Sequence, residues 1–368
     1  MIIQQQLPQL ESLCAQLYNS QNPQERALAE QSLKVFGEST EYIPHCKSIL
    51  DNSSSPYAQL LATSSLLRLV TEQALSVQTR LEMRQYFLGW LESRGPRVEP
   101  FVLVSLLQLL ARVSKLSWWE GEAFRGTPAD AERLLEAAQA ASSPQGYEAG
   151  LRMLAALVAE MNAASGGLSV AQHRKIAVSF RDLSLGSIFQ LSLRAMHSLQ
   201  RSGAQGEERL QEQAASLSLA CLSFDFVGSG MDESSEDVGT IQVPASWRPA
   251  IEDPATLALF FEGYRASASP ALSSKCLECL ARLAAVRRSL FGSEQTRGAY
   301  LSQLVRGTLG VLAARDALQE HANFHELCRL LSRIKINYQL AELVALPEYG
   351  RWVEAVVSLT LDALRAWA

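Results

Sequence analysis

The sequence predicts an all-α protein built from repeated helix pairs. Nearly every long segment spaces its apolar residues with the 3.6-residue period of a helix, and the alternation typical of a surface strand is almost absent. Short breaks rich in Gly, Pro, Asn or Ser separate these segments again and again. Hydrophobic residues make up 48% of the 368 residues and charged residues 19%, so the chain has the material for a large core and is not a disordered protein.

The first helix is expected around Leu7 to Leu17, and Pro23 opens the second, which we expect over 23–36 with Gly37 just beyond its end. The apolar pattern of this second helix places Leu28, Ser32, Val35 and Phe36 on its buried face. The same reasoning predicts further helices at 41–50, 57–71, 77–91, 101–116, 129–141, 145–163, 185–201, 207–222, 255–266, 271–290, 297–314, 323–340 and 347–367.

The helix pairs recur at intervals close to those of a known repeat. Consecutive pairs start near Leu7, Glu41, Val77 and Thr127, which lie 34, 36 and 50 residues apart. Two-helix HEAT repeats are ~40–47 residues long. The sequence therefore predicts a solenoid of HEAT-type repeats, and the helix at 347–367, which has no following partner, predicts a truncated chain.

One segment, 225–248, has no helical period. It contains Gly228, Gly230, Gly239 and Pro244, and loops beyond ~12–15 residues inside a compact array are usually functional or disordered. It is also acidic, because no Lys or Arg occurs between Arg209 and Arg248. We predict that 225–248 is the longest non-helical stretch of the chain.

Charge and targeting signals narrow the function classes. The formal charge of −5 argues against a nucleic-acid-binding protein, which carries an excess of Lys and Arg. The N-terminus has no basic region followed by an apolar one, and the longest apolar stretch, 101–113, is shorter than a membrane span. Six cysteines are too sparse for a disulfide scaffold and indicate a reducing compartment.

Two cysteine patterns could carry chemistry. Cys276 and Cys279 have the CxxC spacing of redox sites and of half a zinc site, but on a helix this spacing is also that of two buried small residues, which we favour. His321, His325 and Cys328 lie at i, i+4 and i+7 and could meet one metal, but packing is favoured because no fourth ligand is evident.

No convergent catalytic set is evident. The chain has no Gly-rich phosphate loop and no Gly-x-Ser-x-Gly nucleophile elbow, so we do not expect an enzyme. Trp118 and Trp119 could anchor a partner or close the core at a helix end.

Several stretches of the sequence resemble those of known proteins. Two of them near the N-terminus, QERALAE (24–30) and YAQLLA (57–62), resemble the N-terminal domain of the importin-β superfamily of nuclear transport receptors. Seven others are HRKIAVSFRD (173–182), FDFVG (224–228), DESSED (232–237), VPASWR (243–248), RRSLF (287–291), FHELCRLL (324–331) and NYQLAEL (337–343), and these resemble the Ran-binding exportins of that superfamily. Receptors of this kind are about three times longer, so the chain resembles their N-terminal third.

The resemblance implies a right-handed superhelix of HEAT repeats whose second helices line the concave face. It implies a receptor that shuttles between nucleus and cytoplasm, with GTP-bound Ran, protein cargo and nucleoporins as partners and with no metal, nucleotide or other cofactor of its own. It divides the chain into Ran-binding repeats (1–120), further repeats (121–224), the acidic loop (225–248) and further repeats (249–368).

The resemblance places the Ran surface on the helices 23–36, 57–71 and 101–116. The polar positions outside their predicted buried stripes are the candidate contacts: Glu30, Gln31, Lys34, Arg68, Gln108, Arg112 and Lys115. Two alternatives remain. The chain could be a HEAT scaffold that does not bind Ran, or a thiol redox or metal protein built on Cys276, Cys279 and Cys328.

The acidic loop is expected to act on a basic surface of Ran, the alternative being a solvated loop without a binding role. Its central carboxylates are Asp232, Glu233, Glu236 and Asp237. Exposed charges act mainly on the association rate. Changing the four to Ser or Asn should therefore slow association with Ran and flatten its salt dependence without lowering the thermal stability. Stopped-flow kinetics across a salt series tests this, and an unchanged rate would leave the loop as a linker.

Overall fold

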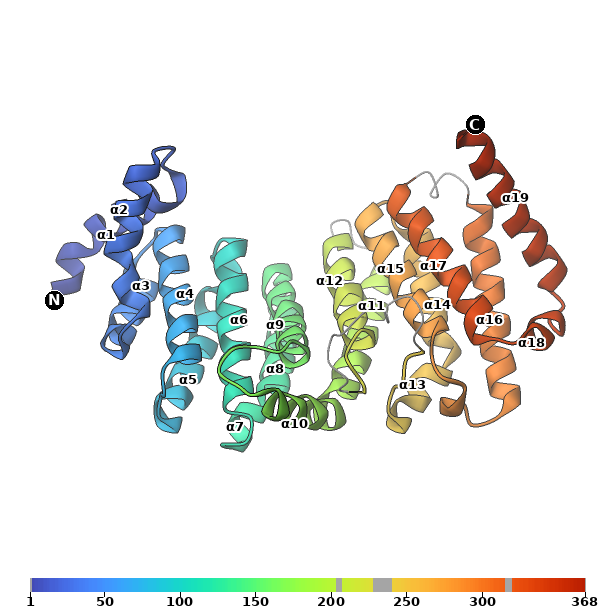
Figure 1. Ribbon diagram of the computed structural model, residues 1–368, viewed down its shortest axis with the longest axis horizontal. Coiled ribbons are helices and arrows are strands. Elements are labelled where there is room, and N and C mark those ends of the chain that lie inside the picture. Colours follow the sequence, from blue (N-terminus) through green and yellow to red (C-terminus); the bar gives the residue numbers. More distant parts are fainter. Residues whose placement is uncertain (1, 203–206, 228–239, 315–319, 368) are drawn as a thin grey trace. The chain divides into compact units, whose positions relative to one another are not determined.

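The computed structural model describes residues 2–202, 207–227, 240–314 and 320–367 (Figure 1). The chain divides into two compact units, Met1–Ala177 and Val178–Ala368, and each is described by itself. Helices account for most of the described residues, and the β-structure recorded there is an isolated bridge between Ile241 and Val286. The all-α, HEAT-type prediction is therefore confirmed.

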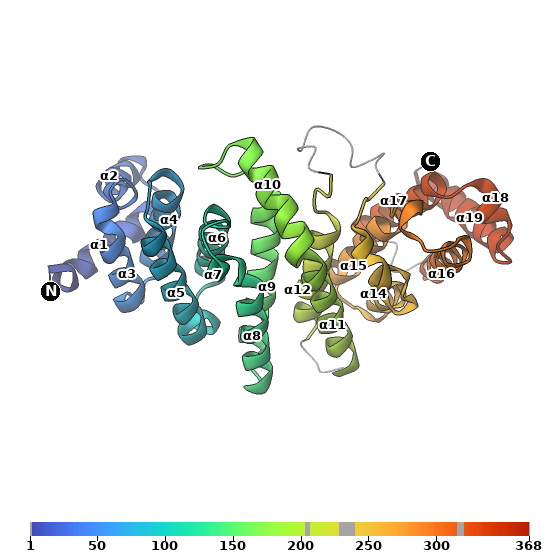
Figure 2. The same cartoon turned by 90° about the horizontal axis from the view of Figure 1, so that it is seen from below.

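The N-terminal unit stacks its helices in two layers. The helices α4, α6 and α9 pack directly on one another, and α3, α5 and α8 pack against them on one side (Figures 1 and 2). The helices of this unit are α1 (Ile2–Asn19), α2 (Pro23–Leu33), α3 (Ile43–Asn52), α4 (Pro56–Glu72), α5 (Val77–Arg94), α6 (Pro100–Leu116), α7 (Glu122–Arg125), α8 (Thr127–Ala140) and α9 (Pro144–Asn162). They are followed by α10 (Val170–Phe180), which crosses the boundary between the units.

The C-terminal unit has the same construction. The helices α12, α15 and α17 form one stack, α11, α14 and α16 form the second layer, and α19 packs on α16. A π-helical turn (Arg181–Leu185) leads into α11 (Gly186–Ser202), α12 (Glu208–Leu222), α13 (Arg248–Glu252), α14 (Pro254–Ala266), α15 (Pro270–Ala284), α16 (Glu294–Ala313), α17 (His321–Asn337), α18 (Leu340–Val344) and α19 (Tyr349–Trp367).

The starts of the helices follow from local chemistry. A polar residue followed by Pro opens five of them, because Pro has no N–H to satisfy at the first helical position and the preceding side chain accepts a hydrogen bond from a free backbone N–H. The five capping residues are Asn22, Ser55, Ser143, Asp253 and Ser269. This pattern explains why the predicted starts of these five helices fall within one residue of the observed ones.

The second helix differs from its prediction. It ends at Leu33, and Lys34–Gly37 forms a 3₁₀ turn. Its buried residues are Ala29 and Leu33, whereas Leu28 is 65% exposed and Ser32 is exposed as well. The predicted buried face was therefore wrong at Leu28 and Ser32. The neighbouring helices cover only a narrow strip of this helix, and that strip contains Ala29 and Leu33.

Four helices were not predicted: α7, α10, α13 and α18. Three of them have only four or five residues, too short for a period to show. The fourth, α10, buries only Ile176 and Phe180 among its apolar residues, so its stripe is thin. The helix predicted at 271–290 ends earlier, at Ala284, where Ala285 and Val286 turn the chain toward the bridge with Ile241.

The predicted acidic loop is described only at its two ends. Residues 225–227 and 240–244 are not helical, but Ala245–Trp247 forms a 3₁₀ turn and α13 begins at Arg248. The carboxylates Asp232, Glu233, Glu236 and Asp237 lie outside the described residues, so their proposed role stays a prediction.

Candidate functional site

One continuous face of α4 and α6 carries three of the seven predicted contact residues, Arg68, Gln108 and Arg112. Residues eleven positions apart on an α-helix lie about three turns apart on nearly the same side. This relation joins Tyr57 to Arg68 on α4 and Phe101 to Arg112 on α6, with Gln108 lying between the latter two. Because α4 packs directly on α6, the two rows lie side by side. The face is aromatic where the helices begin and polar farther along them.

Three rings form an aromatic ladder, Tyr18–Tyr57–Phe101, across α1, α4 and α6. The ring centroids of Tyr18 and Tyr57 are 5.3 Å apart at 17°, and those of Tyr57 and Phe101 are 6.1 Å apart at 21°. The outer two rings are 43% and 40% exposed, and Val104, one turn along α6, is 50% exposed. Rings that stay stacked and half-exposed offer a partner a preformed apolar surface.

The ladder was not predicted from the sequence. Its members lie about forty residues apart along the chain, so no local pattern connects them. A signal was present in the repeated Pro-aromatic start of two helices, Pro56-Tyr57 and Pro100-Phe101. Because Pro fixes the first helical position, an aromatic residue after it occupies an equivalent place on each helix.

Five of the predicted contact residues are solvent-exposed: Glu30, Gln31, Lys34, Arg68 and Gln108. Arg68 lies against the turn that carries Lys34, because a Cβ added to Gly37 would lie 3.1 Å from its Cδ. Each cation has an exposed partner one turn on, Glu38 at 3.2 Å from Lys34 and Glu72 at 3.0 Å from Arg68. Exposed pairs of this kind contribute ~0.3–0.5 kcal/mol, so a partner can take over either cation at little cost.

Lys115 is not on this surface, and its placement among surface residues was wrong. Its side chain is fully buried and its ammonium donates hydrogen bonds to the carbonyls of Glu160 and Ala163 and to Ser165 Oγ. These are acceptors at the end of α9, where the last carbonyls of a helix have no partner within it. Burial lowers the pKa of Lys115 to about 8, although the Glu160 carboxylate 3.8 Å away acts in the opposite direction.

Arg112 lies at the edge of the face and already has partners. Its Nε and Nη2 donate to the two carboxylate oxygens of Glu160 at 2.6 and 3.3 Å, and its Nη1 donates to Thr71 at 3.0 Å. The bidentate pair fixes α6 to α9. Arg112 is therefore half-buried and held in the fold, unlike Lys34 and Arg68.

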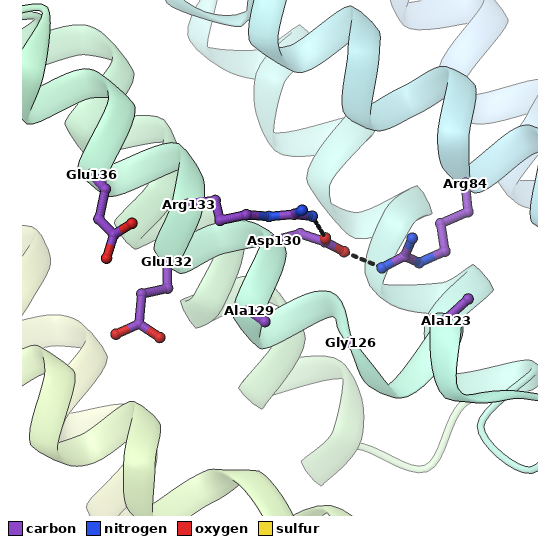
Figure 3. A pocket seen from close by; sticks show the side chains of 8 residues that line it. All are labelled: Arg84, Ala123, Gly126, Ala129, Asp130, Glu132, Arg133 and Glu136. Carbon is purple, nitrogen blue, oxygen red and sulfur yellow. Dashed lines mark hydrogen bonds and ion pairs between the residues drawn. The ribbon is translucent and has the colours of Figure 1, made fainter.

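A separate pocket of about 410 Å³ opens between α5, α7 and α8 (Figure 3). The Asp130 carboxylate lies between the guanidinium groups of Arg84 and Arg133 and pairs with both. The small residues Ala123, Gly126 and Ala129 leave the space open. The Asp130 carboxylate and the two guanidinium groups pair with one another, and the Arg84–Asp130 pair joins α5 to α8. Among the residues that line this pocket, none is positioned as a nucleophile beside a general base.

The CxxC pair is buried, as predicted. Cys276 and Cys279 have no exposed surface, burial raises the pKa of Cys276 to about 12, and the Cys279 thiol lies 3.5 Å from the carbonyl of Ala215. Thiols that hold their proton in an apolar core are poor nucleophiles and poor metal ligands.

The packing predicted for His321, His325 and Cys328 is wrong, because all three are exposed on α17. In the described part of the chain, no three His, Cys, Asp or Glu side chains come together in a way that could hold a metal ion. None of the described helices is long and apolar enough to cross a membrane. Of the tryptophan pair, Trp118 is buried and Trp119 is 57% exposed.

Known proteins resemble this chain over nearly its whole length. Residues 29–92, which include α3, α4 and α5, match the importin-beta N-terminal domain. The chain is 39% identical to Exportin-7-A of Xenopus laevis, over 99% of this chain and 34% of that protein. It is 36% identical to Ran-binding protein 17 of Homo sapiens over 99% of this chain and 34% of that protein. With Ran-binding protein 16 of Drosophila melanogaster the identity is 37%, over 98% and 33%.

The chain spans about a third of the length of these relatives. Their similarity runs through both units, and the matched domain contains Tyr57 and Arg68 of the candidate face. The chain is a homologue of the exportin-7 and Ran-binding protein 16/17 group and carries the importin-β N-terminal domain.

Proposed function

We propose that this chain is the Ran-binding portion of a nuclear export receptor and that GTP-bound Ran docks on the exposed face of α4 and α6. The observation that carries the proposal is the match of residues 29–92 to the importin-beta N-terminal domain, because this stretch includes the aromatic ladder's Tyr57 and the exposed Arg68. Relatives named as Ran-binding proteins, at 36–37% identity, support the choice of partner.

The contact residues follow from exposure. Glu30, Gln31, Lys34, Arg68 and Gln108 remain candidates, and the exposed ladder residues Tyr18 and Phe101 join them. Aromatic residues and Arg are the side chains that most often dominate binding energy at protein interfaces. Arg112 is assigned to the edge of the surface, and Lys115 is assigned to the fold.

The surface is tested with Lys34→Ser and Arg68→Ser combined with Phe101→Ala. We expect this variant to bind Ran loaded with a non-hydrolysable GTP analogue at least about tenfold more weakly, because it removes two cations and an exposed ring from one face. Isothermal titration calorimetry measures the affinity, and circular dichroism should show unchanged helix content.

A matched control removes two exposed cations from other elements of the same unit, Arg133→Ser on α8 and Lys175→Ser on α10. It should bind as the parent does. Equal loss in both variants would mean that Ran responds only to net charge, and no loss in the first would place the Ran surface elsewhere.

The nucleotide state of Ran separates this function from the alternative of a HEAT scaffold. An export receptor binds the GTP form in preference to the GDP form, whereas a scaffold has no reason to distinguish them. A pull-down with both forms decides the matter, and equal recovery would favour the scaffold. We also propose for this receptor the carriage of protein cargo, contact with nucleoporins and shuttling between nucleus and cytoplasm, with residues 1–120 contributing the Ran contact.

A further inference from the structure

The loop that joins α9 to α10, residues 163–169, lies at the polar end of the proposed Ran surface. Figure 1 shows it running across α6, and its Gly167 lies against both α6 and α4. A Cβ added to Gly167 would lie 2.9 Å from the carbonyl oxygen of Thr71 on α4 and 3.4 Å from the side chain of Leu116 on α6. The candidate contacts with Ran do not include any residue of this loop.

Thr71 connects the loop to the proposed Ran surface. It follows Arg68 by one turn on α4, and its hydroxyl accepts a hydrogen bond from Arg112 Nη1 at 3.0 Å. Leu116, the other residue against Gly167, follows Arg112 by one turn on α6. Residues three or four positions apart are neighbours on a helix surface. The loop therefore begins where the two rows that contain Arg68 and Arg112 end.

The loop is held in position by the fold. Lys115 donates hydrogen bonds to the carbonyl of Ala163 and, at 2.8 Å, to Ser165 Oγ. Gly167 has a φ of 87°, in the left-handed region that glycine adopts without strain. A side chain there would also collide with the Thr71 carbonyl, so the close approach to α4 requires glycine. A loop that is already fixed loses little conformational freedom when it binds a partner.

The loop presents backbone groups rather than side chains to the solvent. Its exposed residues have side chains no longer than that of serine: Ala163, Ala164, Gly166, Gly167 and Ser169. Within the described ranges, no hydrogen bond joins the backbone N–H groups of 164–168 to an acceptor of the chain. Such exposed donors are open to a carbonyl or carboxylate oxygen of another molecule, and the small side chains let that molecule approach the backbone closely.

We propose that the loop 163–169 is a further part of the Ran surface and that its backbone N–H groups donate hydrogen bonds to carbonyl or carboxylate oxygens of Ran. The inference rests on the proposed function, because the partner is the one assigned to the adjoining face of α4 and α6. The loop extends that face beyond Arg68 and adds donors that carry no net charge, while Lys115 holds the loop in place from inside the fold.

Hydrogen–deuterium exchange of the intact chain, followed by mass spectrometry, tests the inference with and without Ran loaded with a non-hydrolysable GTP analogue. Amides without an acceptor exchange rapidly, so the amides of 164–168 should exchange fast in the free chain. In the complex we expect them to exchange at least about tenfold more slowly. If Ran binds but leaves their exchange unchanged, this inference alone is overturned. If calorimetry shows no binding of GTP-loaded Ran by the parent chain, the proposed function fails together with it.

A steric variant provides the second measurement. Ala164→Trp places a large side chain on the exposed loop and should weaken the binding of GTP-loaded Ran at least about tenfold in isothermal titration calorimetry. Ala137→Trp is the matched control, because it enlarges an exposed alanine on α8, in the layer that does not carry the proposed surface. It should bind as the parent does, and circular dichroism should show the same helix content in both variants. Equal affinity of the two variants for Ran would contradict a contact at the loop.

Discussion

Replacing Arg297 with Met is expected to destabilise the C-terminal unit by about 3–5 kcal/mol, the range for removing one partner of a buried charge pair. Arg297 is 2% exposed and its guanidinium joins three elements, donating to Glu342 Oε1 at 2.8 Å on α18 and to the carbonyl of Asn337 at 2.7 Å at the end of α17. It also lies over the ring of Tyr338, 4.2 Å from its centroid. Urea unfolding followed by tryptophan fluorescence measures the change as a lower midpoint.

Two further variants make this result specific. Arg297→Lys keeps the charge but cannot reach both acceptors from one planar group, so it should recover less than half of the loss. Arg351→Met removes an exposed arginine of the same unit and should change the stability by less than about 0.5 kcal/mol. If Arg297→Met matched this control, the guanidinium would contribute no net stability.

Replacing Lys115 with Met should cost about 2–3 kcal/mol in the N-terminal unit at pH 7. Met fills a similar volume, but it leaves the carbonyls of Glu160 and Ala163 without their donor, and a buried acceptor without a partner is costly. Thermal or urea unfolding measures the loss. Lys175→Met, on the exposed side of α10, is the control and should be neutral.

The stability gap between the parent and Lys115→Met should also widen with pH. Burial lowers the pKa of Lys115 from its ordinary value of 10.5 to about 8 in the folded chain. Between pH 8 and 10.5 the unfolded chain therefore holds a proton that the folded chain has released, so this group's contribution to stability rises with pH. Below about pH 8 both states are protonated and the gap is constant. The rise should approach about 3 kcal/mol, from 1.36 kcal/mol per pKa unit.

Other groups that titrate in this window are the same in both proteins and cancel in the difference. A gap that is flat from pH 7 to 10.5 would show that Lys115 keeps an ordinary pKa. A gap that narrows would show that its hydrogen bonds hold the proton more strongly than burial disfavours it.

Helix positions could be predicted from the sequence because their signals are local. The helix expected at 101–116 is observed as Pro100–Leu116, and its start follows from a proline whose effect needs no tertiary contact. The buried face of α2 could not be predicted in the same way. Leu28 is apolar yet exposed, because which side of a helix is covered depends on neighbours far away in sequence.

The candidate site was predictable in outline and not in its most distinctive parts. Arg68 and Gln108 are exposed polar residues on helices whose period was clear, and Lys34 is exposed on the 3₁₀ turn after α2. Lys115 is a polar residue on the same helix as Gln108, but it is buried. Its hydrogen-bond acceptors belong to the end of α9, some forty-five residues later in the sequence. The stacking of Tyr18 on Tyr57 likewise depends on how α1 packs against α4, which no property of either residue encodes.

Because five of the six cysteines are buried, a thiol reagent should modify the folded chain at a single position. All six lie within the described residues, and Cys328 on α17 is the one exposed, whereas Cys14, Cys46, Cys221, Cys276 and Cys279 are buried. Burial raises the pKa of Cys328 as well, so a maleimide should react with it slowly at neutral pH but still far ahead of the others. A fluorophore attached to Cys328 therefore labels the C-terminal unit without any engineered cysteine. Reaction with a second equivalent of maleimide would show that a buried cysteine has become accessible, which requires the helices that cover it to open.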